Sequence, residues 1–204
     1  MTDFLQPEGG WFAPSDRLTP PPPTGRKPLF RALSGVARLM GRSEVPDVIA
    51  LLGQYPRLFW PWLAFASRMM PYGKLPPVTR EKLILRTAWH CRSRYEWGQH
   101  VEIGLRAGLT DTEIVAVARG PHGWAGDDDA AALDACDELC RDKRVSAPTW
   151  ERLQARFSGE QLVELTLLVG HYEMLAGFLN TAGLALEPLI EAELQAFYRR
   201  VAGT

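Results

Sequence analysis

The chain has 204 residues and carries 23 Lys and Arg against 24 Asp and Glu, so its formal net charge is −1. This near-neutral balance, with no basic cluster, gives no electrostatic footprint for nucleic acid or for an anionic membrane surface. The hydrophobic content of 46% is that of a globular protein, and the length suits a domain that buries its own core.

Residues 1–28 form a proline-rich N-terminal arm, which includes the run Thr-Pro-Pro-Pro-Pro-Thr-Gly at residues 19–25. Because proline lacks a backbone donor and such a segment buries little, we expect an extended arm or a flexible tail. The arm has no basic segment followed by an apolar run, so it does not resemble a secretory signal. The most apolar long segment, residues 162–189, is interrupted by charged residues. The sequence therefore predicts a cytoplasmic protein with no membrane partner.

From residue 29 the pattern becomes helical, with apolar residues at helical spacing through residue 40. Two further helical segments follow at 46–52 and 56–70. The second carries an aromatic stripe around Trp60 and Trp62, which is typical of core packing or of the mouth of a pocket between subunits. A stripe of this kind would leave much apolar area exposed in a monomer, which favours a homo-oligomer.

Paired polar residues mark several helix starts further along the chain. The Ser/Thr-x-x-Glu/Gln pattern of a capping box occurs three times, at Ser93 with Glu96, Thr110 with Glu113, and Ser158 with Gln161. Thr79, Asp127 to Asp129, and Ser146 are further expected N-terminal caps. The expected helices span about residues 79–90, 93–107, 110–120, 127–143, 146–157, 158–181 and 188–201.

No alternating apolar and polar run is long enough for a strand. The sequence therefore predicts an all-α protein in which residues 29–204 form a single helical domain, a bundle of about eight helices with short connections.

Four polar residues form a candidate proton-transfer site. If both segments are helical, Ser93, Glu96 and His100 share one face at i, i+3 and i+7, and Glu81 projects from the preceding helix. A histidine titrates near neutral pH, and a nearby carboxylate can orient it. The alternative is structural, with Ser93 and Glu96 as a capping box and His100 as a satisfied core residue. In either case the helix N-terminus is expected to hold Glu96 ionised or to bind an anionic group beside Ser93.

Three further residues are candidate pocket residues. Tyr95 and Trp97 flank the acid and are expected either in the pocket wall or in the core. His171 lies in the middle of the most apolar helix, where it either joins the pocket or needs another hydrogen-bond partner.

The three cysteines, Cys91, Cys136 and Cys140, are most simply small apolar core residues. A disulfide between Cys136 and Cys140 is hard to close at helical i, i+4 spacing. No histidine lies at the usual spacing for a zinc site, and no nucleotide-binding motif occurs. The sequence predicts neither a metal nor a cofactor.

The stretch from about Leu75 to Ala107 resembles the signature segment of the carboxymuconolactone decarboxylase family, which includes the AhpD-type alkylhydroperoxidases. Its peroxidase members have a Glu followed twelve residues later by Cys-x-x-Cys-x-x-x-His. Glu81 and His100 match the Glu and the His, whereas Ser93 and Glu96 occupy the two cysteine positions. Because peroxide reduction through a dithiol needs two sulfurs, the resemblance is to the branch that lacks the pair.

The resemblance implies an AhpD-like helical fold and assembly as trimers or hexamers with pockets near subunit contacts. It suggests a cofactor-free enzyme that acts on a small-molecule substrate by acid/base proton transfer, in decarboxylation, lactone opening or isomerisation. His100 would be the general base or acid, with Glu96 as its orienting partner or second acid. Glu81 would be an outer relay, and Ser93 would donate a hydrogen bond to substrate.

Two alternatives stay open. One is a thiol-dependent hydroperoxide reductase that works through Cys91 or through Cys136 and Cys140. The other is a non-catalytic ligand-binding oligomer with an idle pocket.

Overall fold

The computed structural model describes residues 5–22, 45–124 and 129–203, and the helix expected at 29–40 lies outside these ranges. Every regular element in the described ranges is an α-helix, without any strand, which confirms the all-α prediction. Nine helices are described, against about eight expected: α2 (Asp47–Leu52), α3 (Pro56–Ser67), α4 (Pro77–His90), α5 (Arg94–Ala107), α6 (Asp111–Arg119), α7 (Ala130–Asp142), α8 (Ala147–Gln154), α9 (Gly159–Ala182) and α10 (Pro188–Val201).

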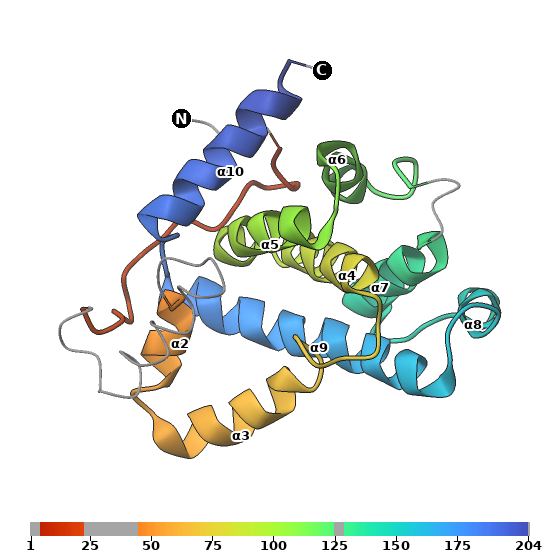
Figure 1. Ribbon diagram of the computed structural model, residues 1–204, viewed down its shortest axis with the longest axis horizontal. Helices are drawn as coiled ribbons and strands as arrows, with labels where there is room; N and C mark the ends of the chain where they lie inside the picture. Colours follow the sequence, from red (N-terminus) through yellow and green to blue (C-terminus); the bar gives the residue numbers. More distant parts are fainter. Residues whose placement is uncertain (1–4, 23–44, 125–128, 204) are drawn as a thin grey trace.

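Helix α4 lies at the centre of the bundle (Figure 1) and contacts α5, α6, α7 and α9. Consecutive residues of α4 enter two separate hydrophobic clusters. Leu83 and Ile84 pack with α7 and α9, and Leu85 packs with α5, α6 and α10. Since neighbouring helices cover most of α4, its polar residues between Thr79 and Thr87 are also buried.

Two of the three expected capping boxes are confirmed. Thr110 with Glu113 begins α6 and Ser158 with Gln161 begins α9, each with both reciprocal hydrogen bonds. The expected N-cap at Thr79 is wrong, because α4 begins two residues earlier at Pro77. Proline suits this first helical position, since its fixed φ and missing N–H cost nothing there.

Asp129 connects three parts of the bundle. It is the N-cap residue of α7, but its side chain makes no cap hydrogen bond. Its carboxylate instead accepts a hydrogen bond from the Thr79 hydroxyl at 2.8 Å and one from Arg156 at 2.9 Å. Lys82 Nζ lies 3.3 Å from the same carboxylate. The other two expected cap residues, Asp127 and Asp128, lie outside the described ranges.

The described part of the N-terminal arm, residues 5–22, is extended and packs on the bundle. The Phe12 amide donates to the Arg92 carbonyl at 3.1 Å, and the Leu18 amide donates to the Ala182 carbonyl at 3.1 Å. The Trp11 ring meets the Trp89 ring edge-on at 5.4 Å. The arm thus joins the α4–α5 turn to the C-terminal end of α9.

Helix α9 is the one described helix that is long and apolar enough, by length and composition, to cross a membrane. Half of its apolar window is buried in this fold, and it contacts α4, α5, α7 and α8. This packing is that of a core helix in a bundle.

The carboxylate of Asp129 should be a major contributor to stability. Replacement Asp129→Ala leaves the buried Lys82 ammonium without one of its carboxylates and is expected to lower the free energy of unfolding by about 3–5 kcal/mol. Urea unfolding followed by circular dichroism measures this change. Asp142→Ala, which removes an exposed pair with Arg141, serves as the control and should leave the urea midpoint unchanged. Equal midpoints for both variants would contradict the assigned role of Asp129.

Candidate active site

Glu81 and His100 meet between α4 and α5, as their spacing predicts. His100 Nδ1 lies 2.7 Å from Glu81 Oε2, and the residues are 6% and 0% exposed respectively. Arg80 Nε donates to the other Glu81 oxygen at 3.3 Å. A carboxylate at Nδ1 fixes the orientation of the ring and directs Nε2 away from the pair. The direct partner of His100 is therefore Glu81, which was expected to be an outer relay.

Gly104 of α5 lies beside Glu81 at this contact. A Cβ atom at Gly104 would lie 2.8 Å from Leu109 Cδ1 and 3.7 Å from Glu81 Cβ. The second distance is ordinary van der Waals contact, so the neighbour that would have to move is the Leu109 side chain, which follows α5. The close approach of the two helices is what brings the carboxylate within hydrogen-bond distance of His100.

The capping box expected at the start of α5 does not form, so that prediction is wrong. Ser93 is the N-cap residue, but its side chain makes no cap hydrogen bond. Ser93 Oγ and both carboxyl oxygens of Glu96 are buried without a hydrogen-bond partner among the described residues. Unpartnered buried polar atoms are rare and destabilising, so helix capping does not explain these two residues.

Burial opposes the ionisation of Glu96 that was expected from its place at a helix N-terminus. The side chain is only 2% exposed, and burial raises the pKa of Glu96 well above its ordinary value. Desolvation of the carboxylate therefore acts against the stabilisation that the helix N-terminus offers. Burial thus favours the protonated form of this carboxyl, which is a proton donor.

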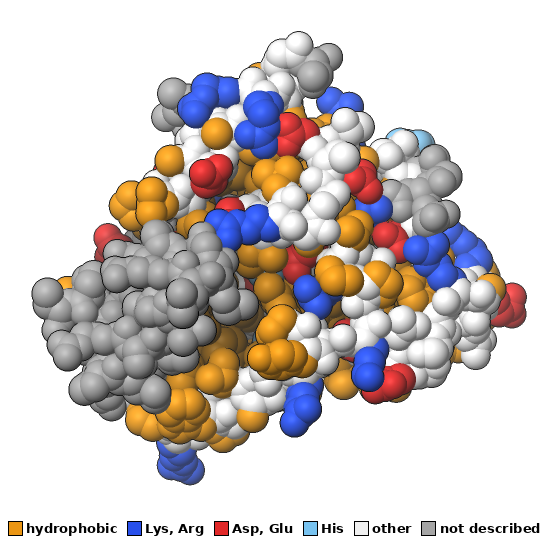
Figure 2. Space-filling view, in the orientation of Figure 1, with side chains coloured by type: hydrophobic (Ala, Val, Ile, Leu, Met, Phe, Trp, Pro, Cys, Tyr) orange, Lys and Arg blue, Asp and Glu red, His pale blue; other side chains and the backbone are white. Residues whose placement is uncertain are grey.

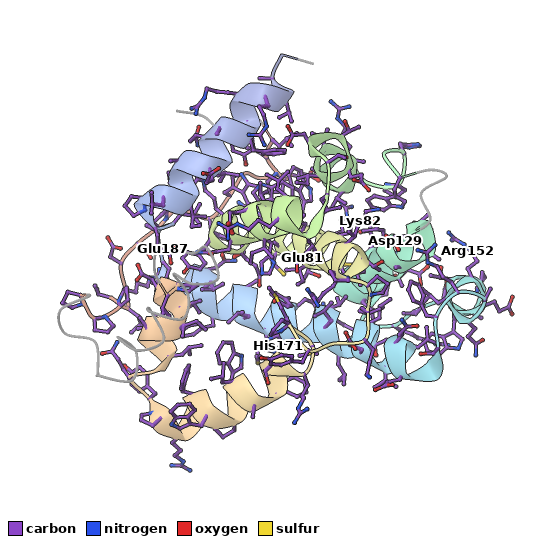
Figure 3. All side chains as sticks on the ribbon, in the orientation of Figure 1. Glu81, Lys82, Asp129, Arg152, His171 and Glu187 are labelled. Atoms are coloured by element: carbon purple, nitrogen blue, oxygen red, sulfur yellow. The ribbon has the colours of Figure 1, made fainter. Side chains whose placement is uncertain are left out.

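These groups surround one cavity of about 440 Å³ between α2, α3, α5 and α9. Glu96, His100 and His171 line it, whereas Glu81 and Ser93 lie in the buried layer behind the wall. Figure 3 shows Glu81 near the centre of the molecule beside α4, and His171 between α9 and α3. Most of the remaining wall is apolar, including Leu63, Met70, Ile103, Leu175 and Leu179.

Of the three predicted pocket residues, Tyr95 and His171 line the cavity and Trp97 does not. Tyr95 lines the cavity, and its hydroxyl donates to Glu187 at 2.7 Å. Trp97 does not line the cavity and is fully buried, with its Nε1 donating to the Tyr198 hydroxyl at 3.1 Å. Successive residues of an α-helix are rotated by about 100° around its axis. When Glu96 faces the cavity, Trp97 is therefore directed toward α10. His171 lines the cavity, with its Nδ1 buried and unpartnered.

Two aromatic residues of the wall were not predicted as site residues. Tyr172 meets the His100 ring edge-on at 5.2 Å, and its hydroxyl lies 3.2 Å from Met70 Sδ. Trp62 stacks on His171 with ring centroids 6.1 Å apart. The signals were present, since Tyr172 follows His171 and Trp62 belongs to the aromatic stripe. However, both patterns are also typical of core packing.

The cysteines lie away from the cavity wall, and all three thiols are free. Burial, followed by the nearby Glu96, raises the pKa of Cys91 to about 12. A hydrogen bond with Cys136, followed by burial, raises the pKa of Cys140 far above its ordinary value. Since the thiolate is the reactive form, neither Cys91 nor Cys140 is activated as a nucleophile.

Over the described ranges, no group of three or more His, Cys, Asp or Glu residues is arranged to hold a metal ion.

Three solved structures share this fold. A variant of the debrominase Bmp8 in complex with 2,3,4-tribromopyrrole has a TM-score of 0.71 at 14% identity, covering 88% of this chain and 96% of that one. An alkylhydroperoxidase AhpD core protein from Ralstonia eutropha has a TM-score of 0.73 at 20% identity, covering 85% and 93%. A peroxidase-related protein from a Silicibacter species has a TM-score of 0.73 at 13% identity, covering 87% and 95%.

A search of curated proteins gave no match. The sequence profile of the carboxymuconolactone decarboxylase family matches residues 56–138, a stretch that includes Glu81, Ser93, Glu96 and His100. Over this segment the chain therefore resembles the carboxymuconolactone decarboxylase family, and its described ranges have the AhpD-like helical fold.

Proposed function

We propose that this protein is an enzyme that moves protons on a small, largely apolar molecule, with His100 as general base and Glu96 as general acid. One observation carries the proposal. The His100 ring, held by the buried Glu81 carboxyl, and the Glu96 carboxyl, whose protonated form is favoured by burial, lie in the wall of the same apolar cavity. An imidazole and a carboxylic acid in one pocket can form a proton-transfer pair.

The chemistry follows from the hydrogen bond at Nδ1. With Glu81 on Nδ1, Nε2 of His100 accepts a proton from the substrate, and the carboxyl of Glu81 stabilises the imidazolium that forms. Glu96 gives its proton to a second atom of the substrate. The substrate loses one proton and gains one, so the net reaction is an isomerisation. Exchange with water then returns His100 and Glu96 to their starting states.

Decarboxylation and lactone opening use the same two groups. In decarboxylation the carbon that loses CO₂ is protonated by Glu96, and in lactone opening His100 removes a proton from the attacking water. Isomerisation suits the cavity best because it needs neither a carboxylate substrate nor a water molecule that attacks the substrate in an apolar space.

The apolar, partly aromatic wall favours a ring as substrate. Bmp8, which shares the fold at low identity, was solved with a brominated pyrrole, a small planar ring. A thiol peroxidase is less well supported, because Ser93 and Glu96 stand where the dithiol would be and burial disfavours the Cys91 thiolate.

Replacement His100→Gln should reduce proton transfer by about a hundredfold, the usual contribution of a positioned general base. The measurement is solvent deuterium incorporation into a panel of cyclic ketones and lactones, followed by NMR in D₂O, which detects proton exchange whatever the net reaction is. His90→Gln is the matched control, since His90 contacts Asp137 outside the cavity and should keep full activity.

The same assay separates the two alternatives. The variant with Cys91, Cys136 and Cys140 all changed to Ala should retain deuterium exchange. Efficient peroxide turnover with a dithiol donor that is lost in this variant would instead establish the thiol peroxidase. A non-catalytic binding protein would be established if a ligand binds tightly while deuterium exchange is absent or is unchanged by His100→Gln.

The buried acid should leave a pH signature in stability. An unfolded glutamate has a pKa of about 4.3 and burial raises that of Glu96, so the unfolded state ionises first as pH rises. The free energy of unfolding of the wild type then falls by up to about 1.4 kcal/mol per pH unit until the pH reaches the pKa of Glu96 in the folded state. Glu96→Gln cannot ionise, so its Tm advantage over wild type should grow as pH rises above about 4.3, the unfolded pKa. Thermal unfolding of this variant beside Glu193→Gln, an exposed control, tests this. A pH-independent Tm difference would show that Glu96 is ionised.

We further propose that the protein is a homo-oligomer. Large apolar side chains gather on the surface near α3 (Figure 2), where Leu58, Trp60 and Phe65 are 69%, 47% and 46% exposed. Contiguous exposed apolar surface of this kind is typical of an interface. Light scattering should give a multiple of 22.8 kDa, and Leu58→Glu with Phe65→Glu should lower the measured mass. A wild-type mass equal to one chain at micromolar concentration would rule out the oligomer.

A further inference from the structure

Two further residues that line the cavity each have a polar atom without a partner. Trp62 Nε1 and His171 Nδ1 are buried, and neither makes a hydrogen bond to any described residue. Both residues line the cavity, Trp62 from α3 and His171 from α9. An indole N–H can only donate, and an imidazole nitrogen donates or accepts. If both atoms stay without a hydrogen bond, the fold is destabilised, unless a ligand supplies the missing partners.

The surrounding rings hold these two atoms in place. The Trp62 and His171 rings are nearly parallel at 21°, and Phe65 meets His171 edge-on at 5.7 Å. His171 is only 6% exposed, and burial lowers its pKa, so its ring is neutral near pH 7. The pair is therefore a rigid, uncharged hydrogen-bonding unit.

One aromatic ring separates this unit from the proton-transfer pair. Tyr172 meets His171 edge-on at 5.4 Å on one side and His100 edge-on at 5.2 Å on the other. A planar molecule lying along Tyr172 can therefore present one polar group to Trp62 and His171 and another to His100 and Glu96. The apolar wall would contact its middle.

The charges in the wall favour a neutral ligand. Among the described lining residues, Arg106 is the one Lys or Arg, and it forms an ion pair with Glu102 one helical turn away. A carboxylate or phosphate in this cavity would lose its hydration without gaining an unpaired cation. A carbonyl, hydroxyl or amide needs only hydrogen bonds, which the wall provides.

We propose that Trp62 and His171 form a second substrate subsite, so that the molecule bound is an uncharged planar ring with a polar group at each end. The two residues determine specificity by binding the group that does not react. This assignment rests on the proposed function in one respect, which is that the cavity is a substrate site.

The test uses three small probes and isothermal titration calorimetry on the full chain. The probe para-xylylene glycol has a hydroxyl group at each end, para-xylene has neither, and 4-(hydroxymethyl)benzoate replaces one hydroxymethyl group by a carboxylate. The glycol should bind about tenfold more tightly than para-xylene and than the benzoate. Trp62→Phe and His171→Phe keep the aromatic stack and should each weaken glycol binding by about three- to tenfold, with para-xylene binding unchanged.

Trp60→Phe is the matched control, since this tryptophan lies on the same helix, half exposed, and should bind the glycol as wild type does. Thermal unfolding of each variant checks that it is folded, and two independent variants guard against the failure of one. A wild type with no preference for the glycol, or a preference that survives both Trp62→Phe and His171→Phe, overturns the subsite. Tightest binding of the benzoate overturns the assignment of a neutral ligand.

The two proposals fail separately. Glycol binding that depends on Trp62, combined with deuterium exchange that is indifferent to His100, removes the catalytic proposal and keeps the subsite. Deuterium exchange that depends on His100, combined with glycol binding that does not depend on Trp62 or His171, removes the subsite and keeps the catalytic proposal.

Discussion

A single buried hydrogen bond, between Glu81 on α4 and His100 on α5, joins the core of the bundle to its cavity. Both residues are almost fully buried, so their polar groups have lost their contacts with water. The folded state is destabilised unless these groups form hydrogen bonds within the protein. The bond also requires α4 and α5 to pack against each other, and these two helices are in extensive contact. Because α4 contacts both hydrophobic clusters, the position of His100 is determined by the whole core.

The start of α5 shows where folding and function compete. Two other helices of this chain close their capping boxes, and the same pattern at Ser93 and Glu96 leaves both side chains buried and unpartnered. Residues that break a local rule at a cost in stability are expected at functional sites. Desolvation favours the neutral form of this acid, and the neutral form is the one that can give a proton to a substrate beside His100.

The rim of the cavity is held by a different network. The Glu187 carboxylate accepts hydrogen bonds from the Tyr95 hydroxyl at 2.7 Å, from Gln99 Nε2 at 2.5 Å and from the Asp47 amide at 2.6 Å. These contacts connect the start of α10 to α5 and α2. Tyr95 is therefore both a wall residue and a structural one, and its hydroxyl is engaged by Glu187 rather than directed at a ligand. Wall groups that already have hydrogen-bond partners shape the pocket, whereas wall groups without a partner can bind a ligand.

Local pattern in the sequence determined the helices, because apolar spacing, prolines and polar caps act within a few residues. The pairing of Glu81 with His100 was predicted from the family resemblance, together with the expectation that two helices joined by a short turn pack side by side. Tertiary structure alone decided the rest. Burial, which depends on distant segments, raised the pKa of Glu96, and the capping box at the same helix start does not form. Packing against α10 turned Trp97 away from the cavity, while the approach of α3 to α9 brought Trp62 onto His171, residues more than a hundred positions apart. Contacts between segments so far apart in sequence depend on how complementary surfaces fit together, and no local spacing encodes that fit.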